Sequence, residues 1–235
     1  MIAEHLVRAG AAVKPKDPRA AELISHLVNW NGRAEAGSTE MAFVEYTRLA
    51  LMGNLLRPQV GDDWLRVYDW WRHVVFLENV LRDRPPQWLP KKFRNYDELL
   101  VASADEAVQR LERESGMKGP ADWHWGDFLQ LQILHPIGRD GVLRWLLSIG
   151  PIPQGGTSHT VKQTGRSFGP AMRFVADLAD WDHSLMNLTV GQSGQLLSPH
   201  YRDHFPAWFE GRGLPSAFSD AAWEKAGVHR LVLKP

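Results

Sequence analysis

The first half of the chain has the spacing of apolar residues that is typical of amphipathic helices. In the stretch DPRAAELISHLVNW, Asp17 stands at the N-cap and Pro18 at the first helical position. Apolar residues then recur every three or four positions, namely Ala20, Leu23, Ile24, Leu27 and Val28. This spacing predicts a helix that begins at residue 18 and turns one apolar side inward.

Three more helices are predicted before residue 116. The second follows Ser38 and ends before Pro58, the third begins at Asp62 or Asp63 and extends to about Leu81, and the fourth spans about Tyr96 to Ser115, with Gly116 as its stop. Their inward positions are, in order, Phe43, Tyr46, Ala50, Leu51 and Leu55, then Val67, Trp71, Val74 and Val75, then Leu100, Ala104, Val108 and Leu111. The first half therefore predicts a helical layer or bundle.

After Gly116 the pattern changes to short extended runs between glycines and prolines. MRFVADL (residues 172–178) and LMNLTV (185–190) alternate as strands do, and ADWD (179–182) has the length of a hairpin loop, so we expect the two strands to pair antiparallel. A helix is expected near Tyr201 to Glu210, then an extended run, HRLVLKP. Helices followed by strands predict an α+β fold, with a helical segment 1–116 and a strand-rich segment 117–235 that together form one incomplete domain.

Composition narrows the classes of function. Lysine plus arginine and aspartate plus glutamate number 27 each, so there is no overall basic field and nucleic acid is not an expected partner. There is no cysteine, which excludes disulfides, thiolate metal sites and cysteine nucleophiles. The first twenty residues lack the apolar core of a signal peptide, and no stretch approaches the roughly eighteen apolar residues of a membrane span, so no membrane partner is expected. Eleven tryptophans are interpreted as packing residues, with an aromatic cage as the alternative.

Ser193, His200 and Asp203 form the tightest group of triad-type residues. A nucleophile elbow reads G-x-S-x-G, but Gly191, Ser193 and Gly194 give G-x-S-G-x. Triads are assembled in space from separate elements, so closeness in sequence is weak support. We interpret the stretch as a turn in which the two glycines adopt positive φ and Ser193 bonds nearby backbone.

Other candidate sites are also interpreted structurally. His200 and His204 have zinc-helix spacing, but the glutamate of H-E-x-x-H is missing and no third ligand stands out. His124 fits a hydrogen-bonded core histidine as well as a ligand. Gly155 and Gly156 are not followed by the lysine of a phosphate loop. Arg173 and Asp177 share one face of the predicted strand, consistent with an internal ion pair or an outward face.

Several rare pairings recur in an order that resembles the penicillin acylases and acyl-homoserine lactone acylases. The resembling stretches are WHWGDFLQLQILHPIG, GGTSHTVKQT, FGPAMRFVADLADWD and LTVGQSGQLLSPHYRDHFPAWFEGR, with LVNWNGRAEAGSTEMAFVEYTRLALM as a weaker match. The resemblance covers the chain from about Glu22 to its last residue. The resemblance implies the C-terminal part of the β chain of an N-terminal-nucleophile hydrolase, whose fold is an αββα sandwich.

In that family a precursor is cut so that a serine becomes a chain start, and its free amine acts as the base. The resemblance implies that this serine and the oxyanion-hole groups lie upstream of the matched segment. Gly37-Ser38 and Gly156-Thr157 are the chain's Gly-Ser and Gly-Thr bonds, but Ser38 opens a helix and Thr157 matches a non-catalytic position. We therefore assign no catalytic, cofactor-binding or metal-binding residue, and we expect no cofactor.

The leading hypothesis is a C-terminal fragment of an amidohydrolase that cleaves N-acyl amides, with its nucleophile on the missing part. That part, or self-association, would be its partner, and the acyl amide would bind only the complete enzyme. The alternatives are a non-catalytic binding or assembly module and a self-contained serine hydrolase using Ser193, His200 and Asp203. Family members are mostly exported, so the resemblance implies periplasm or secretion, and for penicillin acylases a role in antibiotic biosynthesis; the sequence leaves the compartment open.

Overall fold

The computed structural model describes residues 2–68 and 73–233, which include helices throughout and strands in the second half. The α-helices are α1 (Ile2–Ala12), α2 (Pro18–His26), α3 (Thr39–Val67), α4 (His73–Asp83), α5 (Tyr96–Ser115), α6 (Trp125–Phe128), α7 (Gly141–Leu147), α8 (Phe205–Glu210) and α9 (Asp220–Ala226). The strands are β1 (Gln130–Ile133), β2 (Ile149–Pro153), β3 (Met172–Val175), β4 (Leu185–Leu188) and β5 (Leu214–Pro215). Short 3₁₀ helices lie at Leu27–Asn29, Pro86–Trp88, Pro120–Asp122, Trp181–His183 and Pro199–Tyr201.

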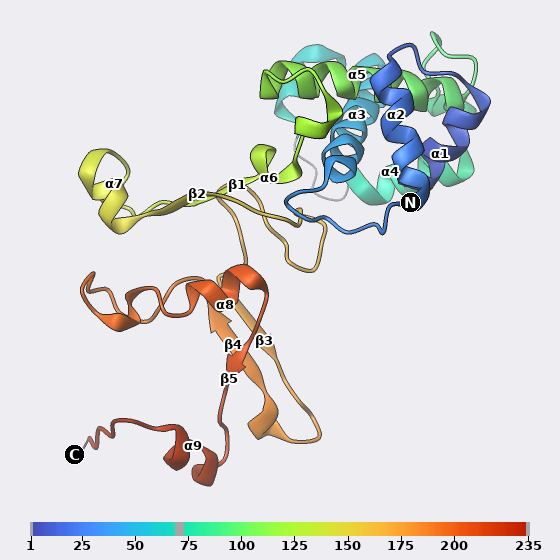
Figure 1. The fold of residues 1–235 in the computed structure, drawn as a ribbon. Helices are drawn as coiled ribbons and strands as arrows, with labels where there is room; N and C mark the ends of the chain where they lie inside the picture. Colours follow the sequence, from blue (N-terminus) through green and yellow to red (C-terminus); the bar gives the residue numbers. More distant parts are fainter. Residues whose placement is uncertain (1, 69–72, 234–235) are drawn as a thin grey trace. The chain divides into compact units, whose positions relative to one another are not determined.

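The chain divides into two compact units, and each is described by itself (Figure 1). The helical unit comprises residues 1–130 and 152–155, and the second unit comprises residues 131–151 and 156–235. The helical unit thus extends past residue 116, which is the predicted end of the helical segment. The fold is α+β, with a helical first half and small antiparallel sheets after it.

The helical unit is built around contacts of α3 with α5 and of α1 with α5 (Figure 1). Three helices begin at side-chain caps: Asp17 accepts from the Arg19 N–H, Ser38 from the Met41 N–H and Asn95 from the Glu98 N–H. The predicted inward residues of the second and fourth helices are all buried. Gly116 ends α5 with φ 72°, as its position predicts.

Asp105 fastens the loop between α1 and α2 to α5. Its carboxylate is buried and accepts the backbone N–H groups of Lys16 at 3.1 Å and Asp17 at 3.0 Å. Asp17 in turn caps α2, so one buried acid fixes the entry into that helix. Because 88 residues separate Asp17 from Asp105, no local pattern indicates this contact.

Several helix predictions were wrong in detail. The sequence reading missed α1, and Val28 is 65% exposed because the chain passes into a 3₁₀ turn at Leu27. The second helix does not end before Pro58: α3 continues to Val67, and its break lies at Gly61, where φ is 77° and ψ 169°. The third predicted helix is interrupted by extended backbone at Tyr68. Val67 and Val75 are exposed, and the prediction for Trp71 lies outside the described residues.

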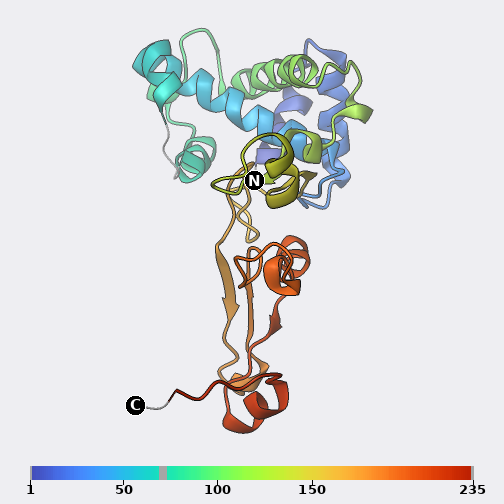
Figure 2. The ribbon, with the colours of Figure 1, turned by 90° about the vertical axis from the view of Figure 1, so that its left-hand side faces the viewer.

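The predicted hairpin of the second unit is confirmed, with shorter strands. In β3 and β4, Met172 faces Leu188 and Val175 faces Leu185 in an antiparallel register, and β5 pairs with the other edge of β4 (Figure 2, gold to orange). The strand ends at Val175 because the Asp177 carboxylate accepts the N–H groups of Ala179 and Asp180 and turns the chain. β1 and β2 form a separate two-stranded sheet.

Trp208 is the central packing residue on one side of β4. It is fully buried, its indole N–H donates to the Pro170 carbonyl at 2.7 Å, and its ring occupies the space where Gly169 would carry a Cβ. The final predicted helix begins only at Phe205, because Pro199–Tyr201 forms a 3₁₀ turn. The predicted extended run near the C-terminus forms no strand within its described residues, 229–233. Within the described ranges no helix is both long and apolar enough to span a bilayer.

Candidate functional site

The stretch that carries Ser193 is held by backbone pairing with the segment that precedes α8. The N–H of Ser193 donates to the His200 carbonyl at 3.1 Å, and the N–H of His204 donates to the Val190 carbonyl at 2.9 Å. Thr189 adds hydrogen bonds from its N–H and its hydroxyl to the carbonyl of Ala171. Residues 188–193 therefore lie between the start of β3 and the residues around His200.

His200 and Asp203 come together, but Ser193 does not join them. Nδ1 of His200 lies 2.8 Å from Oδ2 of Asp203, and this hydrogen bond lowers the pKa of the Asp203 carboxyl below its usual range. The Ser193 hydroxyl instead accepts the N–H of Gln195 at 3.1 Å, as the turn interpretation predicts for a serine that bonds nearby backbone. The described contacts of Ser193 and His200 include no hydrogen bond between their side chains. A Ser–His–Asp relay is therefore not assembled in this structure.

The role predicted for the two glycines was wrong. Neither Gly191 nor Gly194 has positive φ. Gly191 is required for close approach: a Cβ there would overlap the His200 carbonyl and lie 2.6 Å from Oδ1 of Asp203, whereas one on Gly194 would meet nothing within 4 Å. The segment bends at Thr189, Val190 and Gln192, and Gly191 leaves the space that the His200 carbonyl occupies.

His204 is bound into the backbone and does not face His200 as a second ligand. Its Nδ1 accepts the N–H of Leu188 at 3.1 Å, at the end of β4. In residues 2–68 and 73–233 no group of three or more histidines, aspartates or glutamates is placed to hold a metal ion. His124 is exposed between buried Trp123 and Trp125, with Nδ1 3.5 Å from Asp127, so the core interpretation of this histidine was wrong.

Arg173 and Asp177 do not form the ion pair that their spacing allowed, and they have separate roles. The Arg173 guanidinium donates to the carbonyls of Trp208 at 2.6 Å and Lys162 at 2.9 Å, so it joins β3 to α8 and to the preceding loop. Asp177 lies beyond β3 and caps the hairpin turn. Lys162 lies in the stretch GGTSHTVKQT of the family resemblance, where no role was predicted for it, and Arg173 brings it into this cluster.

The paired glycines belong to a folded loop built on threonines. Gly156 has φ 88°, and the hydroxyl of Thr157 accepts the N–H of His159 at 3.0 Å, while its carbonyl accepts from Thr164. Thr157 is buried, and its hydroxyl stabilises the loop by accepting the backbone N–H of His159. Ser38 likewise caps α3. Neither Gly-Ser nor Gly-Thr bond lies at the start of a strand.

Known proteins similar to this chain are acylases. The chain is 26% identical to the acyl-homoserine lactone acylase QuiP of Pseudomonas aeruginosa over 92% of its own length and 29% of that protein. It is 25% identical to the penicillin acylase 2 proenzyme of a Pseudomonas species over 91% of its length and 28% of the relative. The chain thus spans less than a third of the length of these curated relatives.

A solved structure and a family model also match this chain. The fold resembles the thermostable penicillin G acylase from Alcaligenes faecalis, with a TM-score of 0.52 and 15% identity over 99% of this chain and 46% of that one. The penicillin amidase family model matches residues 1–225. With a match over nearly its whole length, this chain belongs to the penicillin amidase family.

Proposed function

We propose that this chain is the C-terminal part of a penicillin-acylase-type amidohydrolase that cleaves N-acyl amide bonds. In this proposal the nucleophile lies on the part of the enzyme that this chain does not match, and the present residues complete the αββα scaffold. The family match over residues 1–225, together with the small share of the relatives' length, carries the proposal.

Two structural facts support it. The Ser193 hydroxyl, near the His200–Asp203 pair, accepts a backbone N–H. The Ser38 hydroxyl caps α3, and the Thr157 hydroxyl accepts a backbone N–H within its loop. The chemistry of an acyl-enzyme needs a serine hydroxyl with a base in reach and donors for the oxyanion. These three hydroxyls are therefore assigned scaffold roles.

The proposal is tested by assaying release of the free amine from an N-acyl-homoserine lactone and from a penicillin, the substrates that the relatives' names suggest. We expect no turnover by the chain alone and turnover when it is co-produced with a polypeptide covering the remainder of the enzyme. Ser193→Ala should leave the rate of the assembled enzyme unchanged. Turnover by the chain alone that is lost in Ser193→Ala would refute the proposal and favour a self-contained serine hydrolase.

A non-catalytic binding module is the second candidate, favoured by one observation. Met172 and Phe174 project from the same face of β3 and are each 53% exposed, so this edge of the three-stranded sheet presents two large apolar side chains to solvent. A module of this kind would self-associate or bind a partner without ever supporting turnover. Light scattering of the pure chain, combined with the co-production assay, separates the two: a dimer that stays inactive with the remainder of an acylase favours the module.

A further inference from the structure

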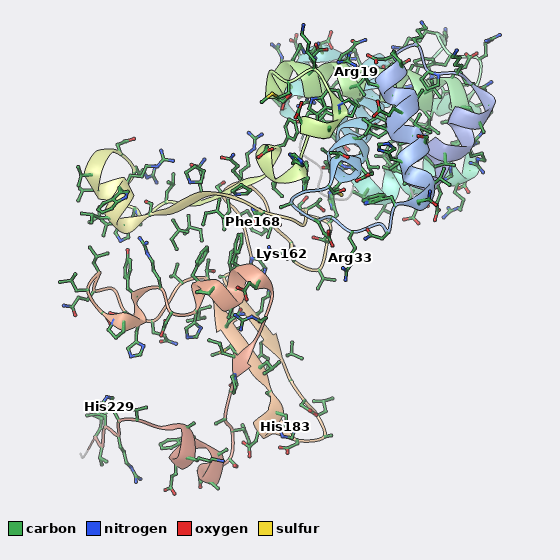
Figure 3. The ribbon with its side chains drawn as sticks, in the orientation of Figure 1. Arg19, Arg33, Lys162, Phe168, His183 and His229 are labelled. Atoms are coloured by element: carbon green, nitrogen blue, oxygen red, sulfur yellow. The ribbon has the colours of Figure 1, made fainter. Side chains whose placement is uncertain are left out.

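Two cations of the second unit lie on neighbouring aromatic rings of α8. The guanidinium carbon of Arg173, on β3, is 4.9 Å from the ring centre of Trp208. The ammonium of Lys162 is 4.6 Å from the ring centre of Phe209. Figure 3 labels Lys162 and Phe168 on the segment that leads from β2 to β3. Both cations are partly buried, so the protein has removed part of their hydration.

Hydrogen bonds fix the two groups beside each other. Arg173 donates from Nη2 to the main-chain carbonyl of Lys162 at 2.9 Å and from Nη1 to the Trp208 carbonyl at 2.6 Å. A guanidinium has five N–H donors, so these two bonds leave three for other acceptors. Because the bond to Lys162 is made to its main-chain carbonyl, the guanidinium of Arg173 stays beside Lys162 in every rotamer of the lysine side chain.

No acid of the described chain balances these charges. In residues 2–68 and 73–233 neither Lys162 nor Arg173 has a carboxylate partner, and Glu210 of the same helix is paired with Arg212. Burial lowers the pKa of the Lys162 ammonium, and the nearby charge of Arg173 lowers it further. Burial also lowers the pKa of Arg173. Two adjacent, partly desolvated cations destabilise each other unless an anion joins them.

We propose that Lys162 and Arg173 form a binding site for one carboxylate group that comes from outside the described residues. The free N–H groups of Arg173 suit a carboxylate, which accepts two of them at once, and Lys162 adds a third donor. The carboxylate is either a small organic anion or an acidic side chain of a second polypeptide. Both present the same chemistry, and the experiment distinguishes them.

The first arm titrates acetate against chloride at constant ionic strength and records the thermal unfolding midpoint and the pKa of Lys162 by NMR. Binding to the folded state alone raises the midpoint until the site is saturated, and it raises the pKa of Lys162 because the anion stabilises the ammonium. Lys162→Met should abolish the acetate effect and, in chloride, raise the midpoint because the repulsion with Arg173 is gone. Lys225→Met, which removes an exposed lysine of the same unit, should change neither.

The second arm tests a protein carboxylate. The chain is treated with a carbodiimide in the presence of a polypeptide covering the remainder of the enzyme, and mass spectrometry locates the new amide bonds. A cross-link from Lys162 to an aspartate or glutamate of that polypeptide, absent in Lys162→Met, identifies the side chain as the source. This arm rests on the proposed function, whereas the acetate arm does not. If acetate has no saturable effect and no cross-link forms, the site does not exist.

Discussion

Single acidic residues decide how several loops of this protein are held. Asp105 is buried and accepts two backbone N–H groups, and Asp182 accepts the N–H groups of Phe218 and Ser219 and the Ser219 hydroxyl. Each carboxylate thereby joins segments that are far apart in sequence, at the start of α2 and of α9. Asp105 lies in no motif, and Asp182 ends the stretch FGPAMRFVADLADWD without a predicted role. What distinguishes both acids is the set of donors that the fold brings to them.

We expect Asp105→Ala to lower the free energy of unfolding by about 3 kcal/mol, because it leaves two N–H groups without their charged acceptor inside the helical unit. Urea denaturation followed by circular dichroism measures the loss. Asp105→Asn keeps one acceptor oxygen and should cost less. A change below about 1 kcal/mol in the alanine variant would show that solvent reaches these N–H groups.

The docking of α9 should depend on pH through Asp182. The pKa of this carboxyl is lowered, first by the hydrogen bond from the Ser219 hydroxyl and then by the N–H groups of Ser219 and Phe218. Because the folded pKa lies below the unfolded value, the carboxylate stabilises the fold above the unfolded pKa of 3.8, and the contribution disappears as pH falls through the folded pKa.

Hydrogen exchange of the α9 amides between pH 3 and 6, corrected for intrinsic rates, tests this dependence. We expect protection of α9 to fall at the acid end in the wild type. Asp182→Asn should show weak protection throughout, with no step. An acid step of equal size in that variant would assign the effect to another group.

At the scale of elements, periodicity identifies helices and strands well, but their ends depend on neighbours. The fourth predicted helix and α5 agree from Tyr96 to Ser115, and the predicted hairpin has its antiparallel pairing. By contrast, the break predicted at Pro58 lies at Gly61, and Gly191, two residues before Ser193, lies against the His200 carbonyl. Close approach between two segments is invisible to a pattern along one of them.

A pair of glycine variants tests that close approach. Gly191→Ala places a methyl group against the His200 carbonyl and should lower the free energy of unfolding by about 1–3 kcal/mol through forced displacement. Gly194→Ala enters open space at ordinary φ and should be neutral or stabilise by about 0.4–1 kcal/mol. Thermal melts of both variants provide the comparison, and equal effects would contradict the packing described.

Across the whole molecule, buried apolar residues are divided very unevenly. The main core cluster consists of residues up to Leu129, all in the helical unit. In the described part of the second unit, the buried apolar side chains are Leu131, Ile149, Ala207 and Trp208, while Trp145 is 79% and Leu197 87% exposed. So few buried side chains provide little stabilisation against the loss of chain entropy.

Backbone amides of the second unit should therefore exchange with solvent much faster than those of α3 and α5 in the isolated chain. Hydrogen exchange read by mass spectrometry measures the difference peptide by peptide, because local opening reports local stability. Residues 229–233, which are exposed and lie in no helix or strand, serve as the internal control for unprotected amides. Matching protection in the two units would show that the second unit is stable by itself.

The sequence by itself determined the helical first half, the antiparallel hairpin and the family, because these follow from spacing and from rare residue pairings along the chain. Only the tertiary structure decided that His200 meets Asp203 without the Ser193 hydroxyl, and that the Arg173 guanidinium donates to the carbonyl of Lys162. Helix and strand periodicity reflect interactions between residues a few positions apart. Donors, acceptors and charges are brought together from distant segments by packing, so their roles are set where those segments meet.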